Sequence, residues 1–212
     1  PFVIMVKKIV PNPGETAYHR LDHAVIEPSL TSEVQAEVLT NFDEKNTLVN
    51  KSSNQDALYR IKQSGMLRVG YNAQIKPFVY FNDRRQLVGY DVENMYELAH
   101  RLNVKLQFIP YTWPYLVSDL VNNKFDIAIG GIFVTGDRLE KVAFTEPYNR
   151  TSASFIVHRD QQDFFTNIDK IRENTNLIVG VFNDPLLIEF VSSMFPNAKI
   201  EILKNFTSTG IF

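Results

Sequence analysis

The stretch from Leu67 to Ile129 alternates between strand-like and helix-like patterns, which sets narrow limits on the fold. The strand-like segments are short and apolar, whereas the helix-like segments repeat apolar residues at helical spacing. Strands that alternate with helices predict a parallel sheet with right-handed crossovers, which is an α/β fold. We expect strands at residues 67–71, 104–109 and 126–129, and helices at residues 91–102 and 113–121.

The loop after the third expected strand is the best candidate for a binding site. In open parallel sheets, ligands bind beyond the carboxyl ends of the strands. This loop carries the paired glycines Gly130 and Gly131, then a helix cap at Thr135 and a cation at Arg138. Free backbone N–H groups, a helix N-terminus and a guanidinium in one place suit a small carboxylate. The alternative is a surface arginine after an ordinary turn, and the local pattern gives the two interpretations equal weight.

The strand and helix pattern begins again at Ser152, which indicates a second unit. Parallel strands with intervening helices are expected here as well. The expected strands are residues 154–158, 177–182 and 200–203, and the expected helices are residues 168–174 and 185–194.

The first 66 residues carry no motif for chemistry. Helical spacing of apolar residues predicts a helix at 31–42, and a second helix at 56–63 ends at Gly65, a left-handed cap. Residues 2–10 are expected to be a strand or a buried chain end, with the clipped tail of a membrane segment as the alternative. The sequence starts at Pro1 rather than Met and shows no charged region with a cleavage site, so no intact signal peptide is visible and we expect a processed or partial chain.

Composition excludes some classes of function. The chain has 212 residues and a net charge of -2, and it shows no basic stripe that would support nucleic-acid binding. It has no cysteine, which excludes disulfides and thiolate metal sites. No run approaches the roughly 20 apolar residues of a membrane helix. His19, Asp22 and His23 lack a further ligand at suitable spacing, so we expect ordinary polar surface residues rather than a metal site, and we expect no cofactor.

A series of motifs along residues 61–148 carries a resemblance to a known family. The motifs resemble those of the family 3 periplasmic solute-binding proteins, which are the amino-acid receptors of ABC transporters, and many motifs at the right intervals are more specific than one. In order they are IKQSGMLRVG at 61–70, PF at 77–78, GYDVE at 89–93, Trp113 with Leu116 and Leu120, KFDI at 124–127, Thr135 with Arg138, and FTEPY at 144–148.

The resemblance implies a two-lobed α/β protein of the type II periplasmic-binding fold. Each lobe would have a parallel sheet with helices on both faces, and the ligand would be trapped between the lobes. Residues 1–55 would be an N-terminal extension or linker, residues 56–151 lobe one, and residues 152–212 an incomplete lobe two. Residues 148–154 would form the first hinge strand.

The resemblance also assigns roles to individual residues. Arg138 would pair with the α-carboxylate of the ligand, assisted by Thr135 and by the backbone of the paired glycines. Asp91 and Asp126 are expected to be structural, Asp91 as a helix cap and Asp126 at the start of a strand. The ligand-binding candidates are Asn72, Ile75, Phe78, Gly130, Gly131, Phe133, Thr135, Arg138 and Asp184.

Three of these positions depart from the family pattern. Phe133 stands where many members have a serine or threonine that contacts the carboxylate, so one hydroxyl contact is lost. Ile75 stands where an aromatic residue often packs on the ligand. Asp184 lies in a turn that replaces the usual Gly-Thr-Thr type, where it would meet an ammonium group or repel a carboxylate. The family's later acidic residue for the α-amino group is expected beyond Phe212.

Three functions follow from the resemblance. The first is a periplasmic or extracytoplasmic binding protein, not an enzyme, that binds an amino acid or related carboxylate and signals to a membrane permease or sensor. The second is an enzyme of the cyclohexadienyl or arogenate dehydratase branch, because residues 126–132 resemble that branch and Phe133 suits a cyclic ligand. That branch eliminates water and carbon dioxide from a prephenate-type acid with a general acid in lobe two. The third is a sensory domain, either a ligand-sensing domain attached to a membrane transporter or sensor, or an orphan sensory or docking domain that has lost its ligand.

Overall fold

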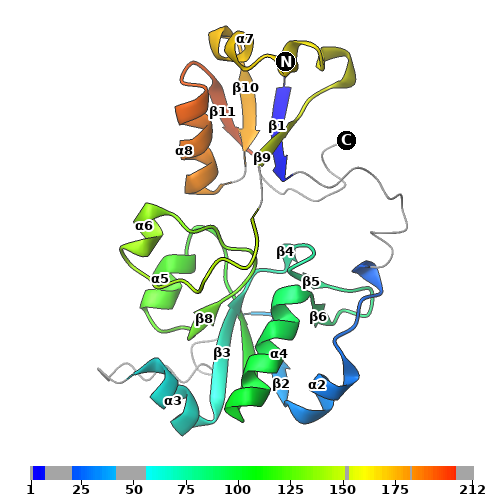
Figure 1. Cartoon of the computed structure of the whole chain (residues 1–212), viewed down its shortest axis with the longest axis vertical. Coiled ribbons are helices and arrows are strands. Elements are labelled where there is room, and N and C mark those ends of the chain that lie inside the picture. The colour runs from blue at the N-terminus through cyan, green and yellow to red at the C-terminus, as the bar shows by residue number, and fades with distance from the viewer. Residues whose placement is uncertain (1, 8–20, 42–55, 151–152, 182, 204–212) are drawn as a thin grey trace. The chain divides into compact units, whose positions relative to one another are not determined.

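Two α/β units make up the chain, each with its own sheet and its own hydrophobic core (Figure 1). Unit 1 comprises Pro1–Asn12 and Pro147–Phe212, and unit 2 comprises Pro13–Glu146. The structure is a computed structural model, and it describes residues 2–7, 21–41, 56–150, 153–181 and 183–203. The expected α/β class is confirmed.

Unit 2 is built on a four-stranded sheet in the order β2-β7-β3-β8, in which every neighbouring pair is parallel. The prediction of a parallel sheet is therefore confirmed. The carboxyl ends of all four strands lie at one edge, where the loops with the candidate residues begin. The strands are β2 (Ala36–Val38), β3 (Met66–Tyr71), β7 (Lys105–Pro110) and β8 (Ile127–Ala128).

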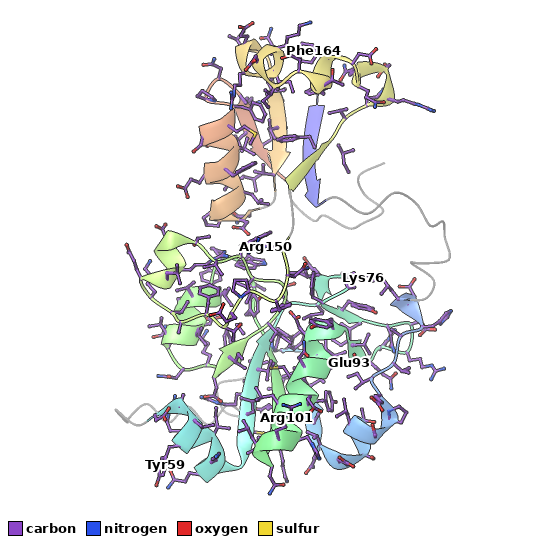
Figure 2. The ribbon with its side chains drawn as sticks, in the orientation of Figure 1. Tyr59, Lys76, Glu93, Arg101, Arg150 and Phe164 are labelled. Carbon is purple, nitrogen blue, oxygen red and sulfur yellow. The ribbon has the colours of Figure 1, made fainter. Side chains whose placement is uncertain are left out.

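Three helices of unit 2 end close to where the sequence predicts. The helix α3 (Ala57–Ser64) begins after Asp56, whose side chain accepts a hydrogen bond from Leu58 N, and it ends at Gly65 with φ of 68°. The helix α4 (Tyr90–Leu102) ends at Asn103, also left-handed with φ of 54°. A shorter helix, α5 (Leu116–Val121), precedes β8. Exposed side chains on these helices, such as Tyr59 on α3 and Arg101 on α4, are labelled in Figure 2.

A small antiparallel sheet lies between β3 and α4 in the chain. It consists of β4 (Gln74–Ile75), β5 (Val79–Phe81) and β6 (Leu87–Val88). The helix α4 packs against β5, β6 and β7, so the small sheet joins the main core of unit 2. Val79 and Val92 are fully buried in that core.

The prediction of a helix at residues 31–42 is wrong. The structure has a short helix, α2 (Pro28–Glu33), followed by the strand β2. Leu106 N donates to Gln35 O, and Leu39 N donates to Phe108 O, so the backbone here extends along β7 and forms the edge strand of the sheet. The apolar residue Val34 is 4% exposed in the core of unit 2. Ladder hydrogen bonds and burial therefore outweigh the helical spacing, which is a weak preference over so short a stretch.

Unit 1 contains a second sheet, in the order β11-β10-β1-β9. Its first strand comes from the start of the chain: β1 (Phe2–Lys7) pairs in parallel with β10 and antiparallel with β9. The remaining strands are β9 (Ala153–Ile156), β10 (Ile178–Val181) and β11 (Lys199–Ile202), the α-helices are α7 (Ile168–Glu173) and α8 (Pro185–Met194), and two short 3-10 helices span Arg159–Gln161 and Phe164–Thr166.

The expected domain boundaries therefore differ from the structure in one respect. Within residues 1–55, the described parts belong to the two units: β1 lies in the sheet of unit 1, and residues 21–41 contribute to unit 2. Ile26 and Val34 are buried in the core of unit 2, which explains the second assignment. The change between units falls after Glu146, close to the expected boundary at residue 151.

Candidate ligand-binding site

Arg138 is a buried cation in a short helix. It lies in α6 (Gly136–Leu139), and the hydroxyl of Thr135 accepts a hydrogen bond from Arg138 N at 3.3 Å, so the predicted cap at Thr135 is confirmed. Arg138 is 8% exposed. Its Nη1 donates to Phe133 O at 2.9 Å, and its guanidinium carbon lies 5.1 Å from the centre of the Trp113 ring. A guanidinium carries five donors in a planar fork, so it can hold a main-chain carbonyl and a carboxylate at the same time.

Gly130 and Gly131 form the turn after β8, with φ of 123° and 59°. These angles favour glycine. Their N–H groups donate to Asp91 Oδ2 at 2.9 Å and 3.1 Å. This differs from the free backbone donors that the sequence led us to expect. Any contribution of the two glycines to carboxylate binding is therefore through the shape of the turn, which sets the direction of the chain toward Phe133.

Asp91 is structural, but it does not cap α4. The residue before the helix is Gly89, and no side chain caps the helix. The carboxylate of Asp91 is 3% exposed and accepts the two glycine N–H groups instead. A carboxylate that accepts two backbone N–H groups compensates for the cost of its burial. Asp91 therefore fixes the loop after β8 to the start of α4.

The wall residues expected in lobe one lie in different surroundings. Ile75 lies beside the glycine turn, because a Cβ on Gly130 would be 3.6 Å from Ile75 Cδ1. The side chain of Asn72 accepts a hydrogen bond from Gln74 N at 3.2 Å, and so forms a local turn. Phe78 is 8% exposed and belongs to the core of unit 2. Phe133 is 37% exposed, and its carbonyl is the part that contacts Arg138.

Asp184 lies in unit 1, directly before α8, where its carbonyl accepts a hydrogen bond from Ile188 N. It is not among the residues that unit 2 brings together around Arg138. Its predicted contact with a ligand ammonium group stays a prediction.

The sequence did not reveal the partner of Arg138. Trp113 was matched to a family helix, but the structure places its ring under the guanidinium. Trp113 is the single tryptophan of the sequence, and a cation over an aromatic face is attractive. No spacing rule joins a residue before α5 to a residue in α6, so only the fold reveals this contact.

No metal centre forms among the residues that the structure describes: no group of three or more possible ligands is found there. Asp22 pairs with Lys76 at 2.5 Å, and His23 pairs with Asp83 at 2.8 Å (Lys76 is labelled in Figure 2). His19 lies outside the described residues. Asp22 and His23 thus serve to attach the N-terminal segment to the small sheet.

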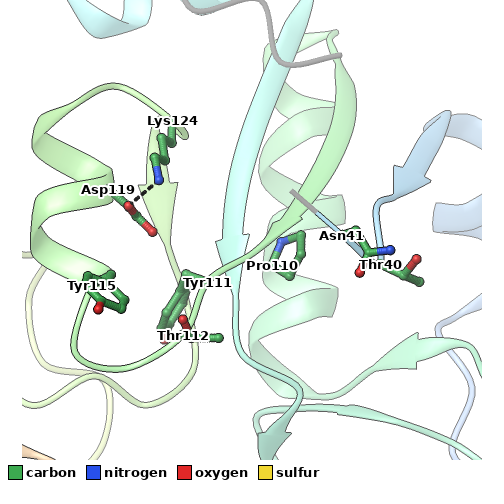
Figure 3. A pocket seen from close by; sticks show the side chains of 8 residues that line it. All are labelled: Thr40, Asn41, Pro110, Tyr111, Thr112, Tyr115, Asp119 and Lys124. Atoms are coloured by element: carbon green, nitrogen blue, oxygen red, sulfur yellow. Dashed lines mark ion pairs between the residues drawn. The ribbon is translucent and has the colours of Figure 1, made fainter. Parts of the chain in front are cut away.

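A separate hollow of about 480 Å³ lies at the carboxyl ends of β2 and β7 (Figure 3). An ion pair between Asp119 and Lys124, at 2.7 Å, forms part of its wall. The hollow contains none of the ligand-binding residues expected from the sequence. Its lining residues are Thr40, Asn41, Pro110, Tyr111, Thr112, Tyr115, Asp119 and Lys124.

Comparison with known proteins identifies the family. Residues 67–208 match the model for bacterial extracellular solute-binding proteins, family 3. The chain is 33% identical to cyclohexadienyl dehydratase of Pseudomonas aeruginosa over 117 residues, which are 55% of this chain and 44% of that protein. It is 33% identical to the L-cystine-binding protein TcyA of Bacillus subtilis over 110 residues, which are 51% of this chain and 41% of that protein. The chain thus spans about half the length of the curated relatives it matches.

Solved structures share the fold. One is an amino acid ABC transporter substrate-binding protein of Streptococcus pneumoniae bound to L-arginine. It matches with a TM-score of 0.63 at 26% identity, and the match covers 72% of this chain and 63% of that protein's chain. Another is an ancestral amino acid-binding protein, a precursor of cyclohexadienyl dehydratase. It matches with a TM-score of 0.61 at 29% identity, and the match covers 70% of this chain and 65% of that protein's chain. The expected two-lobed type II periplasmic-binding fold is confirmed.

Within the described part of the chain, no helix has the length and apolar character needed to cross a membrane. Family 3 solute-binding proteins are periplasmic or otherwise extracytoplasmic. Because the family model covers more than half of the chain, and solved structures of amino-acid-binding proteins share its fold, the chain belongs to the bacterial extracellular solute-binding proteins of family 3.

Proposed function

We propose that this chain binds an amino acid, or a related small carboxylate, and that Arg138 pairs with the α-carboxylate. The observation that carries the proposal is the buried guanidinium of Arg138, held by Phe133 O and by the ring of Trp113. A guanidinium that is shielded from water binds a carboxylate more strongly than one at the surface, because water screens the charges less. Thr135 supports this geometry by capping α6.

The relatives support the ligand class. Family members that match this chain are described as binding L-cystine and arginine, and both ligands carry an α-carboxylate. A carboxylate contact from Arg138 would suit any amino acid, so this contact sets the class rather than the identity of the ligand.

A thermal-shift experiment tests the proposal. L-arginine, L-cystine and L-histidine are compared with agmatine, cystamine and histamine, which have the same side chains but lack the carboxylate. An amino acid present at about 100 times its dissociation constant stabilises the protein by roughly 2.7 kcal/mol. We expect at least one amino acid to raise the melting temperature and its amine analogue to leave it unchanged.

A variant pair sharpens this experiment. Arg138→Gln removes the charge, whereas Arg84→Gln removes a charge from an exposed arginine of the same unit. The ligand-induced shift is expected to vanish in Arg138→Gln and to persist in Arg84→Gln. Equal shifts with an amino acid and its amine analogue, or a full shift in Arg138→Gln, would contradict the role of Arg138.

The same proposal extends to localisation and partner. We propose that the protein acts outside the cytoplasm and delivers or reports its ligand to a membrane permease or sensor, with the family assignment as support. The measurement is fractionation of cells that produce the full-length protein. Recovery of the protein in the cytoplasm would contradict the proposed localisation, and a free, processed protein in the periplasm would contradict attachment to a membrane transporter or sensor.

A dehydratase is the second candidate, because a cyclohexadienyl dehydratase is among the relatives at 33% identity. The apolar residue Phe133, whose carbonyl accepts from Arg138 and which is 37% exposed, suits a cyclic acid. Incubation with prephenate would then produce phenylpyruvate, which is followed by its absorbance. If no phenylpyruvate is formed, the dehydratase candidate is removed.

A domain that has lost its ligand is the third candidate. In that case the Arg138→Ala variant would behave as the parent protein does in every binding assay.

A further inference from the structure

Contacts of different kinds hold the guanidinium of Arg138. Phe133 O accepts a hydrogen bond from Nη1 at 2.9 Å, and the Trp113 ring lies 5.1 Å from the guanidinium carbon. The first contact acts at the edge of the guanidinium and the second brings an aromatic ring against it. Two contacts in different directions restrict both the position and the rotation of a side chain that is otherwise highly flexible.

Trp113 is itself held in place. Its ring meets Tyr111 edge-on, with ring centres 5.6 Å apart and planes at 90°. Tyr111 is 3% exposed, and its hydroxyl donates to Ile129 O at 3.2 Å. Tyr111 and Phe125 also form part of a small core with Trp113 packed against it. The ring under Arg138 is therefore fixed by the ends of β7 and β8.

We propose that Trp113 is a positioning residue, which orients the guanidinium of Arg138 before a ligand arrives. The inference rests on the proposed function, in which Arg138 binds the α-carboxylate. An arginine that is already ordered loses less conformational freedom on binding, so the affinity for the carboxylate rises. The role of Trp113 is thus exerted through Arg138 and not through the side chain of the ligand.

A ligand-free experiment tests the contact first. Trp113 is the single tryptophan, so the tryptophan fluorescence of the protein reports on this ring alone. Replacing Arg138 with glutamine removes the cation from the ring, and we expect a shift of the emission maximum and more quenching by acrylamide. Arg84→Gln serves as the control and should leave both unchanged. Identical emission of the parent and Arg138→Gln would overturn the inference, whatever the protein binds.

Binding measurements then test the role. Calorimetric titration with L-arginine, L-cystine and L-histidine is compared for the parent, Trp113→Phe and Trp113→Leu. Phenylalanine keeps an aromatic face and leucine does not, so we expect about a tenfold loss of affinity in Trp113→Leu and less than about threefold in Trp113→Phe, from the usual strength of a partly buried cation–π contact. Melting curves of both variants establish that they are folded.

A double-mutant cycle separates positioning from direct contact with the ligand. In an Arg138→Lys background the flexible ammonium group has no planar fork to orient, so Trp113→Leu should cause little further loss. An equal loss in both backgrounds would overturn the inference, since Trp113 would then act on the ligand itself. If no amino acid binds the parent, the proposed function fails and the positioning role with it. Unchanged affinity in Trp113→Leu overturns the inference alone.

Discussion

At the scale of single residues, position 89 requires glycine because the backbone of Phe78 passes close to it. The φ of Gly89 is 127°, and a Cβ at this position would lie 2.3 Å from Phe78 O. We expect Gly89→Ala to lower the free energy of unfolding by about 2 kcal/mol or more, because the backbone is strained and the carbonyl cannot move freely. Urea unfolding measures this loss.

Gly136 provides the matched control for that substitution. A Cβ on Gly136 would meet no heavy atom within 4 Å, and its φ is not positive. Gly136→Ala should therefore change stability by no more than about 0.5 kcal/mol, and a small gain is the expected sign in a helix. Equal losses in the two variants would contradict the explanation given for Gly89.

Glu93 gives a prediction about pH. Burial, and then the negative charge of Glu27, raise the pKa of the Glu93 carboxyl above its ordinary value of 4.5. The folded protein therefore holds this proton more tightly than the unfolded chain does. The stability that comes from the protonated carboxyl is fully present below the ordinary pKa, and it is lost as the pH rises through the folded pKa.

A permanently neutral side chain removes this loss. Glu93→Gln should be more stable than the parent near neutral pH, and the difference should disappear below pH 4.5. Glu140→Gln, at an exposed position, is the control and should show no such pH dependence. Thermal unfolding across this pH range is the measurement, and a Glu93→Gln protein that is less stable than the parent at neutral pH would contradict it.

At the scale of elements, a buried ion pair connects β3 to the segment before β8. Asp126 is 4% exposed at its side chain and lies 2.6 Å from Arg68 Nη2, and Arg68 Nη1 donates to Asn123 O at 2.8 Å. Asp126→Ala leaves the guanidinium without its carboxylate, so we expect a loss of about 3 kcal/mol in urea unfolding. Glu97→Ala, which breaks the exposed pair with Arg101, should cost less than about 1 kcal/mol. Similar losses of unfolding free energy in Asp126→Ala and Glu97→Ala would contradict the explanation that burial makes the first ion pair more costly to break.

The edge strands show where local pattern is insufficient. The sequence predicted α4 and its left-handed end at Asn103 because the helix has enough residues for its apolar spacing to be clear. It did not predict β2, because three residues cannot establish a strand pattern and the pairing partner β7 is far away in the chain. A strand or a buried chain end was expected at β1, and β9 and β10 were also expected, but the pairing of β1 with them was not, since they lie more than 140 residues later.

At the scale of the whole molecule, two separate cores predict two unfolding transitions. Gly89→Ala affects unit 2, whereas Val179→Ala removes methyl groups from a fully buried position of unit 1 at a cost of about 2 kcal/mol. We expect each variant to lower one calorimetric transition and to leave the other in place. A single transition that both variants lower would show that the units unfold together.

The sequence by itself determined the α/β class and the family, and it supplied the candidate residues of the proposed site. Those follow from strand and helix periodicity over ten or more residues, and from many motifs at the right intervals along residues 61–148. Only the tertiary structure decided what these residues contact. Asp91 accepts hydrogen bonds from the N–H groups of the glycine turn, and the ring of Trp113 lies against the guanidinium of Arg138, through contacts between residues that no periodicity joins. Periodicity reports which face of an element is buried, whereas the partner across the core depends on how distant elements pack.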